Sequence, residues 1–370
     1  MKVVISGYVG KKITGIGRNL INLLDYAQGG NEFVIYTNND MAGDFKFKNR
    51  NVEVKTYPVS KNSSMGNLLW TTFVFPFVVL KEHARRALIP NFTLLLFKFV
   101  PTYVIIHDLI EFNVPQKFSK KKMFYRTKLA NPVTSKIANK IITVSQNSKL
   151  DIKNFLGVKD SKIEVIYNGV DRTKFSPVSK SVCNLILQER NWPDHFLLYA
   201  GTIDHPGKNA MAVIKVFEHM KKTNSYEGKL ILAGMPGSGY EIIQTYVQAS
   251  EYEADILLTG YISDEELIVL YTHCDVFCFV SLYEGFGIPP LEALSCGAKV
   301  VVSNTSSLPE VVGNVGWSAN PRDLNDIEKA IKSALIADNN TIYHEKVKDH
   351  LKNYDWNNLG RQFEECLCRE

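Results

Sequence analysis

Short apolar runs, alternating with amphipathic stretches along the whole chain, constrain its fold more than any other feature. The apolar runs are VVIS (3–6), FVIY (33–36), YVIIHD (103–108) and KIITVS (140–145) in the first half, and FLLYAG (196–201), KLILAG (229–234), DILLTG (255–260), VFCFVS (276–281) and KVVVSN (299–304) in the second. Amphipathic stretches such as NAMAVIKVFEHMKK (209–222) and DEELIVLYTHC (264–274) lie between them. Nearly continuous apolar strands separated by helices indicate parallel sheets with both faces covered. The sequence therefore predicts an α/β fold with doubly wound sheets.

The length of 370 residues favours two domains over a single core. The turn-rich segment NGVDRTKFSP (168–177), and the polar stretch that follows it, separate the two sets of strands. We predict Rossmann-like domains over 1–178 and 179–352, and a C-terminal helix over 353–370 that packs back toward the N-terminal domain. Two such domains are expected to face each other across a cleft lined by the carboxyl ends of their strands, where doubly wound sheets bind ligands.

Charge is distributed unequally between the two halves. The whole chain has 43 Lys and Arg against 38 Asp and Glu, a net charge of +5. Residues 1–178 carry 27 against 12, a net charge of +15, whereas residues 179–370 carry 16 against 26, a net charge of −10. This asymmetry favours contact of the first half with a polyanion or an anionic membrane.

Several classes of protein are disfavoured. The start, MKVVISGYVG, has the pattern of a buried strand and a glycine loop rather than of a secretory signal. The most apolar run, LLWTTFVFPFVVL (68–80), has 13 residues, so we expect buried core there, because a membrane span needs about 20. Six cysteines without a secretory signal indicate reduced thiols in a cytosolic protein, with Cys274 and Cys278 as core residues rather than zinc ligands.

The most informative segment is SLYEGFGIPPLEALSCGAKVVVSN (281–304), which has the pattern of a strand, a glycine loop, a short helix and a strand. Gly285 and Gly287 allow the backbone to approach a ligand closely. Pro289 and Pro290 suit the first positions of a helix, where no N–H is needed. The segment therefore predicts a helix N-terminus directly after a glycine loop.

Two carboxylates flank the backbone amides of residues 286–288, which would point from that N-terminus toward an anion such as a diphosphate. Glu284 precedes the loop, and Glu292 lies in the expected first turn of the helix. Sugar hydroxyls suit carboxylates beside a phosphate site, because a carboxylate accepts two hydroxyl donors at once. Glu292 alone is explained equally well as an acid that the helix dipole favours. Together, the two glutamates and the loop indicate a nucleotide-sugar site.

At this point the sequence resembles a known family. The frame EGFGIPPLE, which runs from Glu284 to Glu292, is similar to the E-x7-E motif of retaining glycosyltransferases of the two-domain GT-B type, and of glycosyltransferase family 4 among them. Other segments occur in family order: GIGRNLINLL (15–24), IIHDLIEFNVP (105–115), KIITVSQNSKLDI (140–152), KIEVIYNGVD (162–171), YAGTIDHPGKN (199–209), LTGYISDEEL (258–267) and SSLPEVVG (306–313). The resemblance is strongest to bacterial mannosyl- and rhamnosyltransferases that extend O-antigen and other surface polysaccharides.

The resemblance implies roles in the C-terminal domain, which would bind the nucleotide sugar. Glu284 would contact the donor sugar and Glu292 the nucleotide ribose. The other residues that would line the donor site are Thr202, Lys208, Asn209, Gly285, Phe286, Gly287 and Ile288. Lys208 would also stabilise charge that develops on the leaving diphosphate. Thr202 and Gly207 depart from the family pattern, because many members have arginines there.

In the N-terminal, acceptor-side domain the resemblance implies roles for a glycine loop and a histidine. Gly15, Ile16 and Gly17 would cover the donor phosphates, although a structural turn explains them equally well. His107 would orient the sugar or the acceptor near the reacting carbon, whereas without the resemblance a single histidine is more often structural. Asp108 is expected to be a cap or a loop acid rather than a general base.

The implied reaction is hexose transfer with retention of anomeric configuration. The family suggests front-face substitution, in which a donor phosphate oxygen helps to deprotonate the acceptor while the protein positions the reactants and stabilises charge. The sequence contains no D-x-D, so we predict that the reaction requires neither a metal nor a cofactor. GDP-mannose is the expected donor; UDP- or dTDP-sugars, and a non-catalytic homologue that binds a sugar nucleotide, remain open alternatives.

The stretch KFSKKKMFYRTKLANPVTSKIANK (117–140) carries eight Lys and Arg and no acid. Apolar residues interleave with the basic ones, as in an interfacial helix beside anionic lipid. We therefore expect contact with an anionic membrane at the inner face of the cell membrane, where the acceptor would be a lipid-linked saccharide; a solvated basic surface is an equal alternative. Nucleic acid is not expected, because no nucleic-acid-binding motif accompanies the stretch. Apolar contacts from Trp70, Phe73, Phe75 and Phe77 are conceivable, but we expect most of these side chains in the core.

Two rival functions use similar folds. A two-domain sugar-binding protein of the periplasmic type also has α/β lobes, but the N-terminal sequence and the glutamate loop disfavour it. A phosphorylase or a sugar epimerase shares the fold, and a phosphorylase would need a cofactor lysine site that the sequence does not reveal.

Overall fold

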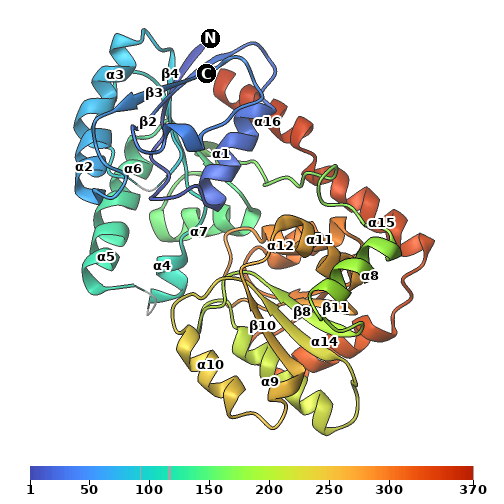
Figure 1. Cartoon of the computed structure of the whole chain (residues 1–370). Helices are drawn as coiled ribbons and strands as arrows, with labels where there is room; N and C mark the ends of the chain where they lie inside the picture. The colour runs from blue at the N-terminus through green and yellow to red at the C-terminus, as the bar shows by residue number, and fades with distance from the viewer. Residues whose placement is uncertain (92, 116–117, 370) are drawn as a thin grey trace. The chain divides into compact units, whose positions relative to one another are not determined.

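The computed structural model describes residues 1–91, 93–115 and 118–369, which form two compact units (Figure 1). Unit 1 comprises residues 1–169 and 354–369, and unit 2 comprises residues 170–353. The chain therefore passes from unit 1 to unit 2 after Gly169 and returns at Tyr354, so that the C-terminal helix belongs to unit 1. The fold class is confirmed, since each unit is a doubly wound parallel α/β sheet.

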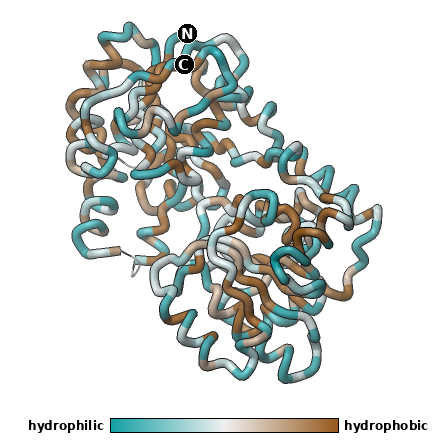
Figure 2. The backbone as a smooth tube through the Cα atoms, viewed as in Figure 1, coloured by the Kyte–Doolittle hydropathy of each residue, from teal (hydrophilic) through white to brown (hydrophobic). Residues whose placement is uncertain are grey.

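The sheet of unit 1 has seven parallel strands in the order β3-β2-β1-β4-β5-β6-β7. The strands are β1 (Lys2–Ser6), β2 (Glu32–Asn38), β3 (Val52–Tyr57), β4 (Arg86–Ile89), β5 (Thr102–Ile105), β6 (Lys140–Thr143) and β7 (Ile163–Val165). Val3 of β1 is in register with Phe33 of β2 and with Arg86 of β4. Figure 2 shows hydrophobic colour along the central strands, which agrees with a sheet buried on both faces, whereas the edge strand β3 carries Glu53 and Lys55.

Helices cover both faces of this sheet. They are α1 (Gly15–Asp25), α2 (Ser64–Leu69), α3 (Phe75–Lys81), α4 (Ile110–Asn113), α5 (Lys120–Phe124), α6 (Asn131–Ile137), α7 (Gln146–Leu156) and α16 (Trp356–Cys368). The C-terminal helix α16 packs against α1 and β2, with the Phe363 ring 6.5 Å from that of Phe33. The Glu364 carboxylate accepts hydrogen bonds from the Gly29 amide and from Asn31 Nδ2, the latter at 2.8 Å. Apolar and polar contacts together attach α16 to unit 1.

The expectation of buried core for residues 68–80 is wrong for half of its aromatic residues. This run lies in an 18-residue helix, Ser64–Lys81, in which a π-helical turn (Trp70–Val74) joins α2 to α3. Trp70 and Phe75 are buried against the sheet, whereas Phe73 and Phe77 are 48% and 56% exposed. Among the described residues, this helix alone has the length and apolar composition of a membrane span, which is weak evidence because core helices pass the same test.

Unit 2 repeats the arrangement with six parallel strands in the order β10-β9-β8-β11-β12-β13. The strands are β8 (Phe196–Ala200), β9 (Lys229–Ala233), β10 (Ile256–Gly260), β11 (Val276–Phe279), β12 (Val300–Ser303) and β13 (Trp317–Ala319). Strand order reverses between β8 and its neighbour β11: the chain continues from β8 toward β9 and β10 on one side, and from β11 toward β12 and β13 on the other. Such a switch point leaves a crevice at the carboxyl edge of a doubly wound sheet.

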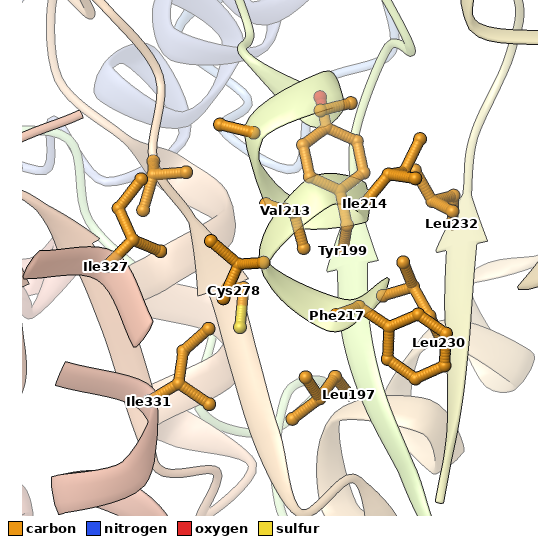
Figure 3. Packing of buried hydrophobic residues seen from close by; sticks show 14 of the residues in the cluster. Leu197, Tyr199, Val213, Ile214, Phe217, Leu230, Leu232, Cys278, Ile327 and Ile331 are labelled. Carbon is orange, nitrogen blue, oxygen red and sulfur yellow. The ribbon is translucent and has the colours of Figure 1, made fainter. Parts of the chain in front are cut away.

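The helices of unit 2 complete its core. They are α8 (Lys180–Glu189), α9 (Ala210–Lys222), α10 (Tyr240–Gln248), α11 (Asp264–His273), α12 (Ile288–Ser295), α13 (Leu308–Val312), α14 (Leu324–Ile336) and α15 (Thr341–Leu351). Figure 3 shows Leu197, Phe217, Cys278 and Ile331, from two strands and two helices, in one apolar cluster. Cys278 is fully buried there, which confirms it as a core residue.

Candidate active site

The predicted donor-site residues of unit 2 lie at the carboxyl edge of its sheet. Thr202, Lys208 and Asn209 follow β8, and Glu284 lies in the loop after β11, the neighbouring strand. The Leu282 amide donates to the Gly207 carbonyl oxygen at 3.0 Å, which ties the two loops together. The structure thus gathers residues far apart in the sequence at the switch point of one sheet.

Lys208 and Glu284 form an ion pair, with Nζ 2.6 Å from Oε1. The two side chains are 27% and 14% exposed, so the pair is partly shielded from solvent. Lys208 Nζ also lies 5.5 Å from the centre of the Phe279 ring. The Lys208 amide donates to Asp204 Oδ1 at 2.5 Å, which fixes the backbone of the lysine. This pair places a cation and a carboxylate at one point.

Asn209 positions the lysine loop rather than presenting its amide to solvent. Its backbone is left-handed, with φ of +57°, and its Nδ2 donates to the carbonyl oxygens of Val280 at 3.0 Å and Pro321 at 2.8 Å. Thr202 is exposed and lies directly after Gly201, so it contributes a hydroxyl where an arginine would contribute a charge.

The glycine loop has the geometry that the sequence predicts. Gly287 has φ of +115° and lies directly before α12, and a Cβ there would be 2.6 Å from Leu308 Cδ2. Both its backbone angle and its surroundings therefore require glycine. Pro289 and Pro290 occupy the first turn of α12, so the amides of Gly287 and Ile288 are the donors at the head of this helix.

Glu292 differs from its expected place. It lies beyond the first turn of α12, which contains no acid, so the helix dipole does not account for it. Glu292 is half-buried near Tyr271 and Cys296. Burial, together with the charge of Glu292, raises the pKa of Cys296 to about 12. The carboxylate therefore lies half-buried beyond the first turn of the helix rather than in a helix-capping position.

Two serines that the sequence did not single out for the site hold the glycine loop. Ser306 Oγ accepts a hydrogen bond from the Glu284 amide at 3.1 Å. The Ser307 hydroxyl donates toward the carbonyl oxygens of Glu284 at 3.0 Å and Phe286 at 2.5 Å. Both serines follow β12, the strand next to β11, and this adjacency is the signal that could have identified them.

In unit 1 the glycine loop lies after β1, at the start of α1. A Cβ on Gly17 would be 3.1 Å from side-chain carbons of Val9 and Ile13, whereas a Cβ on Gly15 would meet open space. Gly17 therefore permits close packing of the loop, while Gly15 leaves room above the helix N-terminus. Ile16 lies between them in the first turn of α1, which holds no acidic residue.

His107 follows β5 and reaches the loop after β4. Its Nε2 lies 3.2 Å from the Pro90 carbonyl oxygen, which can only accept, so Nε2 carries the proton and Nδ1 is the acceptor of the ring. Burial lowers the pKa of His107 to about 4, so the ring is neutral at pH 7. Asp108 Oδ1 accepts from the Ile110 amide at 3.1 Å, the loop-capping contact expected of it.

The structure therefore forms two groups of predicted residues, one at the carboxyl edge of each sheet. The expected approach of the two groups across a cleft stays a prediction. Within the described residues, no group of three or more His, Cys, Asp and Glu is placed to hold a metal ion.

Two protein-family models together match most of the chain. The model for Glycosyltransferase Family 4 matches residues 13–174, and the model for Glycosyl transferases group 1 matches residues 188–353. The two matches correspond closely to unit 1 and unit 2.

Individual proteins are also similar. O-antigen chain mannosyltransferase B of Escherichia coli is 32% identical over 259 residues, which cover 69% of this chain and 67% of that protein. The serotype-specific mannosyltransferase WbdA of Escherichia coli is 28% identical over 67% of this chain, although the match spans only 30% of WbdA. Among solved structures, Anabaena HepE in complex with UDP and glucose superposes with a TM-score of 0.75 at 18% identity and covers 99% of both chains, which shows a shared fold.

Proposed function

Since the chain belongs to glycosyltransferase family 4, whose enzymes have the two-domain GT-B fold, we propose that it transfers mannose from GDP-mannose to a lipid-linked glycan during synthesis of a bacterial surface polysaccharide such as O-antigen. The names of its relatives support mannose and O-antigen as the substrate class, since the first two described above are mannosyltransferases. The match to WbdA covers less than a third of that protein, so the proposal concerns one transfer reaction.

The ion pair of Lys208 and Glu284 beside the head of α12 is the observation that carries this proposal. A diphosphate needs a cation and backbone amides, and a hexose needs a hydroxyl acceptor. Lys208 and the amides of Gly287 and Ile288 would provide the cation and the amides for the diphosphate. Glu284 would provide the hydroxyl acceptor for the hexose. Glu292 is proposed to receive the ribose hydroxyls, and Thr202 a phosphate oxygen.

In the proposed reaction the acceptor hydroxyl forms a bond to the anomeric carbon on the face from which the diphosphate leaves. The bond between that carbon and the diphosphate oxygen breaks, its electron pair stays on the diphosphate, and the hydroxyl proton passes to a diphosphate oxygen. Lys208 stabilises the charge that develops on the leaving group. Neutral His107 accepts a sugar or acceptor hydroxyl through Nδ1 and so orients it.

The basic stretch 117–140 is proposed to hold the enzyme at the inner face of an anionic membrane, where a lipid-linked acceptor resides. Lys120, Lys121, Lys122 and Lys128 are exposed there, as is Phe124 at 61%. Lys117, which begins the stretch, lies outside the described residues. Arg126 points inward instead, because its guanidinium lies 3.7 Å from the buried Glu111 carboxylate.

A nucleotide panel followed by a transfer assay tests the proposal. Thermal unfolding with GDP, UDP, dTDP and ADP should show stabilisation by GDP alone, of roughly 2.7 kcal/mol at about 100 times its dissociation constant. With GDP-mannose and membrane lipid extract, the glycan product should carry the α anomer of the donor, seen by NMR. Selective stabilisation by UDP or dTDP would overturn the choice of donor, an inverted product would overturn retention, and nucleotide binding without turnover would favour the non-catalytic alternative.

A further inference from the structure

The amino edge of the unit 1 sheet, opposite to the edge that carries Gly15 and His107, contains an open cavity of about 620 Å³. Four lysines line it: Lys98 precedes β5, Lys136 precedes β6, and Lys159 and Lys162 precede β7. The proposed transfer reaction uses none of them. The cavity is therefore a feature of the molecule separate from the candidate active site.

Within the described part of the chain, these four lysines have no carboxylate partner. No Asp or Glu lines the cavity, and no ion pair involves any of the four. The nearby Asp160 pairs instead with Lys149 at 3.0 Å and Lys153 at 2.9 Å. The cavity thus concentrates four positive charges without a counter-charge from the protein.

Hydrogen bonds hold two of the four cavity lysines, Lys98 and Lys162, in place. Lys98 Nζ donates to the Ile137 carbonyl oxygen at 2.6 Å and to Asn139 Oδ1 at 2.5 Å, and Lys162 Nζ donates to the Lys136 carbonyl oxygen at 2.9 Å. Burial lowers the pKa of Lys98, and burial together with the charge of Lys98 lowers the pKa of Lys162. An anion in the cavity would relieve this repulsion, and the positioned ammonium groups would have little entropy left to lose.

An apolar face lies beside the cavity. The helix Ser64–Lys81 exposes six apolar side chains, Met65, Leu69, Phe73, Val74, Phe77 and Leu80, each between 44% and 66% accessible. Phe99, which follows Lys98, is 48% exposed, and its ring centre is 5.2 Å from that of Phe77. The apolar face therefore extends to the residue next to the cavity lysine.

We propose that the lysine cavity binds the phosphate of an anionic phospholipid headgroup while Phe77 and Phe99 enter the boundary of the bilayer. Charge complementarity selects the occupant, because only a membrane lipid presents a phosphate and an apolar layer side by side. A free phosphate would leave the apolar face without a role. This contact adds to the membrane association proposed for the basic stretch, and vesicle binding measures it without any sugar transfer.

Cosedimentation with vesicles tests the proposal. The full chain should bind phosphatidylcholine vesicles that contain about 30 mol % phosphatidylglycerol. The double substitution Lys159→Gln with Lys162→Gln, at two cavity lysines outside the basic stretch 117–140, should weaken binding roughly thirtyfold, at about fivefold per neutralised lysine. The matched control, Lys46→Gln with Lys48→Gln, removes the same charge from exposed positions of unit 1 away from the cavity and should change affinity less than twofold. Lys46, Lys48 and Lys159 are exposed and Lys162 is half-buried, so thermal unfolding of each variant verifies the fold.

A second variant separates the headgroup from the apolar contact. Phe77→Ser with Phe99→Ser should weaken binding to the acidic vesicles but leave the response of the lysine Nζ resonances to inorganic phosphate unchanged. If the cavity variant and the Lys46/Lys48 control lost vesicle affinity equally, the proposal would be overturned in favour of a diffuse attraction between basic residues and the membrane. Equal binding to vesicles of pure phosphatidylcholine would also overturn it, as would phosphate binding without vesicle binding. A failed transfer assay with intact vesicle binding would count against the proposed function only.

Discussion

At the scale of single residues, the candidate site is arranged around one short contact between opposite charges. In the structure Glu284 neutralises Lys208 at 2.6 Å. A diphosphate near Lys208 would share its charge, and hydroxyls near Glu284 would replace the lysine as partners. The pair therefore keeps both groups in place until a donor takes over each of them.

Replacing either member of the pair should separate sugar recognition from diphosphate recognition. Glu284→Gln keeps the shape of the side chain but weakens its acceptor capacity, so kcat should fall on the order of 10²-fold with little change in GDP affinity. Lys208→Gln should lower both kcat and GDP affinity, because the lysine is proposed to bind the diphosphate. Steady-state kinetics and GDP-dependent thermal shifts measure the two effects. Near-normal turnover in Glu284→Gln would refute the role given to this carboxylate.

His107 should make stability depend on pH. Its pKa in the folded chain is about 4, below the ordinary value of 6.5, so the unfolded chain binds its proton first as the pH falls. The contribution of the neutral His107 ring to the free energy of unfolding is therefore fully present above pH 6.5. It is lost as the pH falls from 6.5 to about 4, at no more than about 1.4 kcal/mol per pH unit. Urea unfolding of the wild type and His107→Gln at several pH values isolates this slope. Identical slopes in the two proteins would contradict the burial of a neutral ring.

The sequence predicted the charged residues of the site but not what holds them. Glu284 and Lys208 belong to motifs with a chemical meaning, so a pattern suffices to find them. The hydrogen bonds from Ser306, Ser307 and Asp204 join loops from different strands, and they depend on strand order, which only the structure shows.

At the scale of elements, strands with continuous apolar sequence were predictable and the others were not. Strand β3 was missed because the charged residues Glu53 and Lys55 interrupt its apolar sequence at the edge of the sheet. Strands β7 and β13 have three residues each and lie at sheet edges, where short segments carry little pattern. Strand β4 is central, but it has only four residues and begins within the basic pair Arg85 and Arg86, which obscured it.

The loop before α12 should tolerate no side chain at Gly287. Gly287→Ala forces a Cβ onto a residue with φ of +115° and to within 2.6 Å of Leu308 Cδ2, and should cost roughly 1–3 kcal/mol of stability as well as donor binding. Gly43→Ala, at an open position without positive φ, is the matched control and should be neutral within about 0.5 kcal/mol. Chemical unfolding and GDP titration check both. Adding Leu308→Ala to Gly287→Ala should remove the steric cost of the new Cβ but not the cost of the positive φ.

At the scale of the whole molecule, the chain visits unit 1 twice, and α16 completes it. Composition and strand pattern predicted two domains, but the boundary lies at Gly169 rather than at residue 178, because Val170 and Phe175 are already buried with unit 2. Sequence pattern marks where strands cease, whereas burial decides to which core a loop belongs.

The polar link of α16 should stabilise unit 1 specifically. Glu364→Ala would leave the Gly29 amide and the Asn31 side chain without their carboxylate acceptor, at a cost of about 1–3 kcal/mol. Glu365→Ala, which removes a carboxylate that is 54% exposed, should cost less than about 0.5 kcal/mol. Hydrogen exchange should show faster opening of β1 and β2 in the first variant, with α9 of unit 2 unchanged. Equal effects on both units would contradict the assignment of α16 to unit 1.

The return of the chain to unit 1 also sets the order in which a nascent polypeptide can mature on the ribosome. All seven strands of unit 1 emerge before residue 170, but the apolar surface around Phe33 stays uncovered until Phe363 and its neighbours have been synthesised. Unit 2 has its complete set of strands and helices by residue 353. The segment translated second therefore matures first, and the segment translated first waits with an open hydrophobic face, which is where a chaperone would be needed.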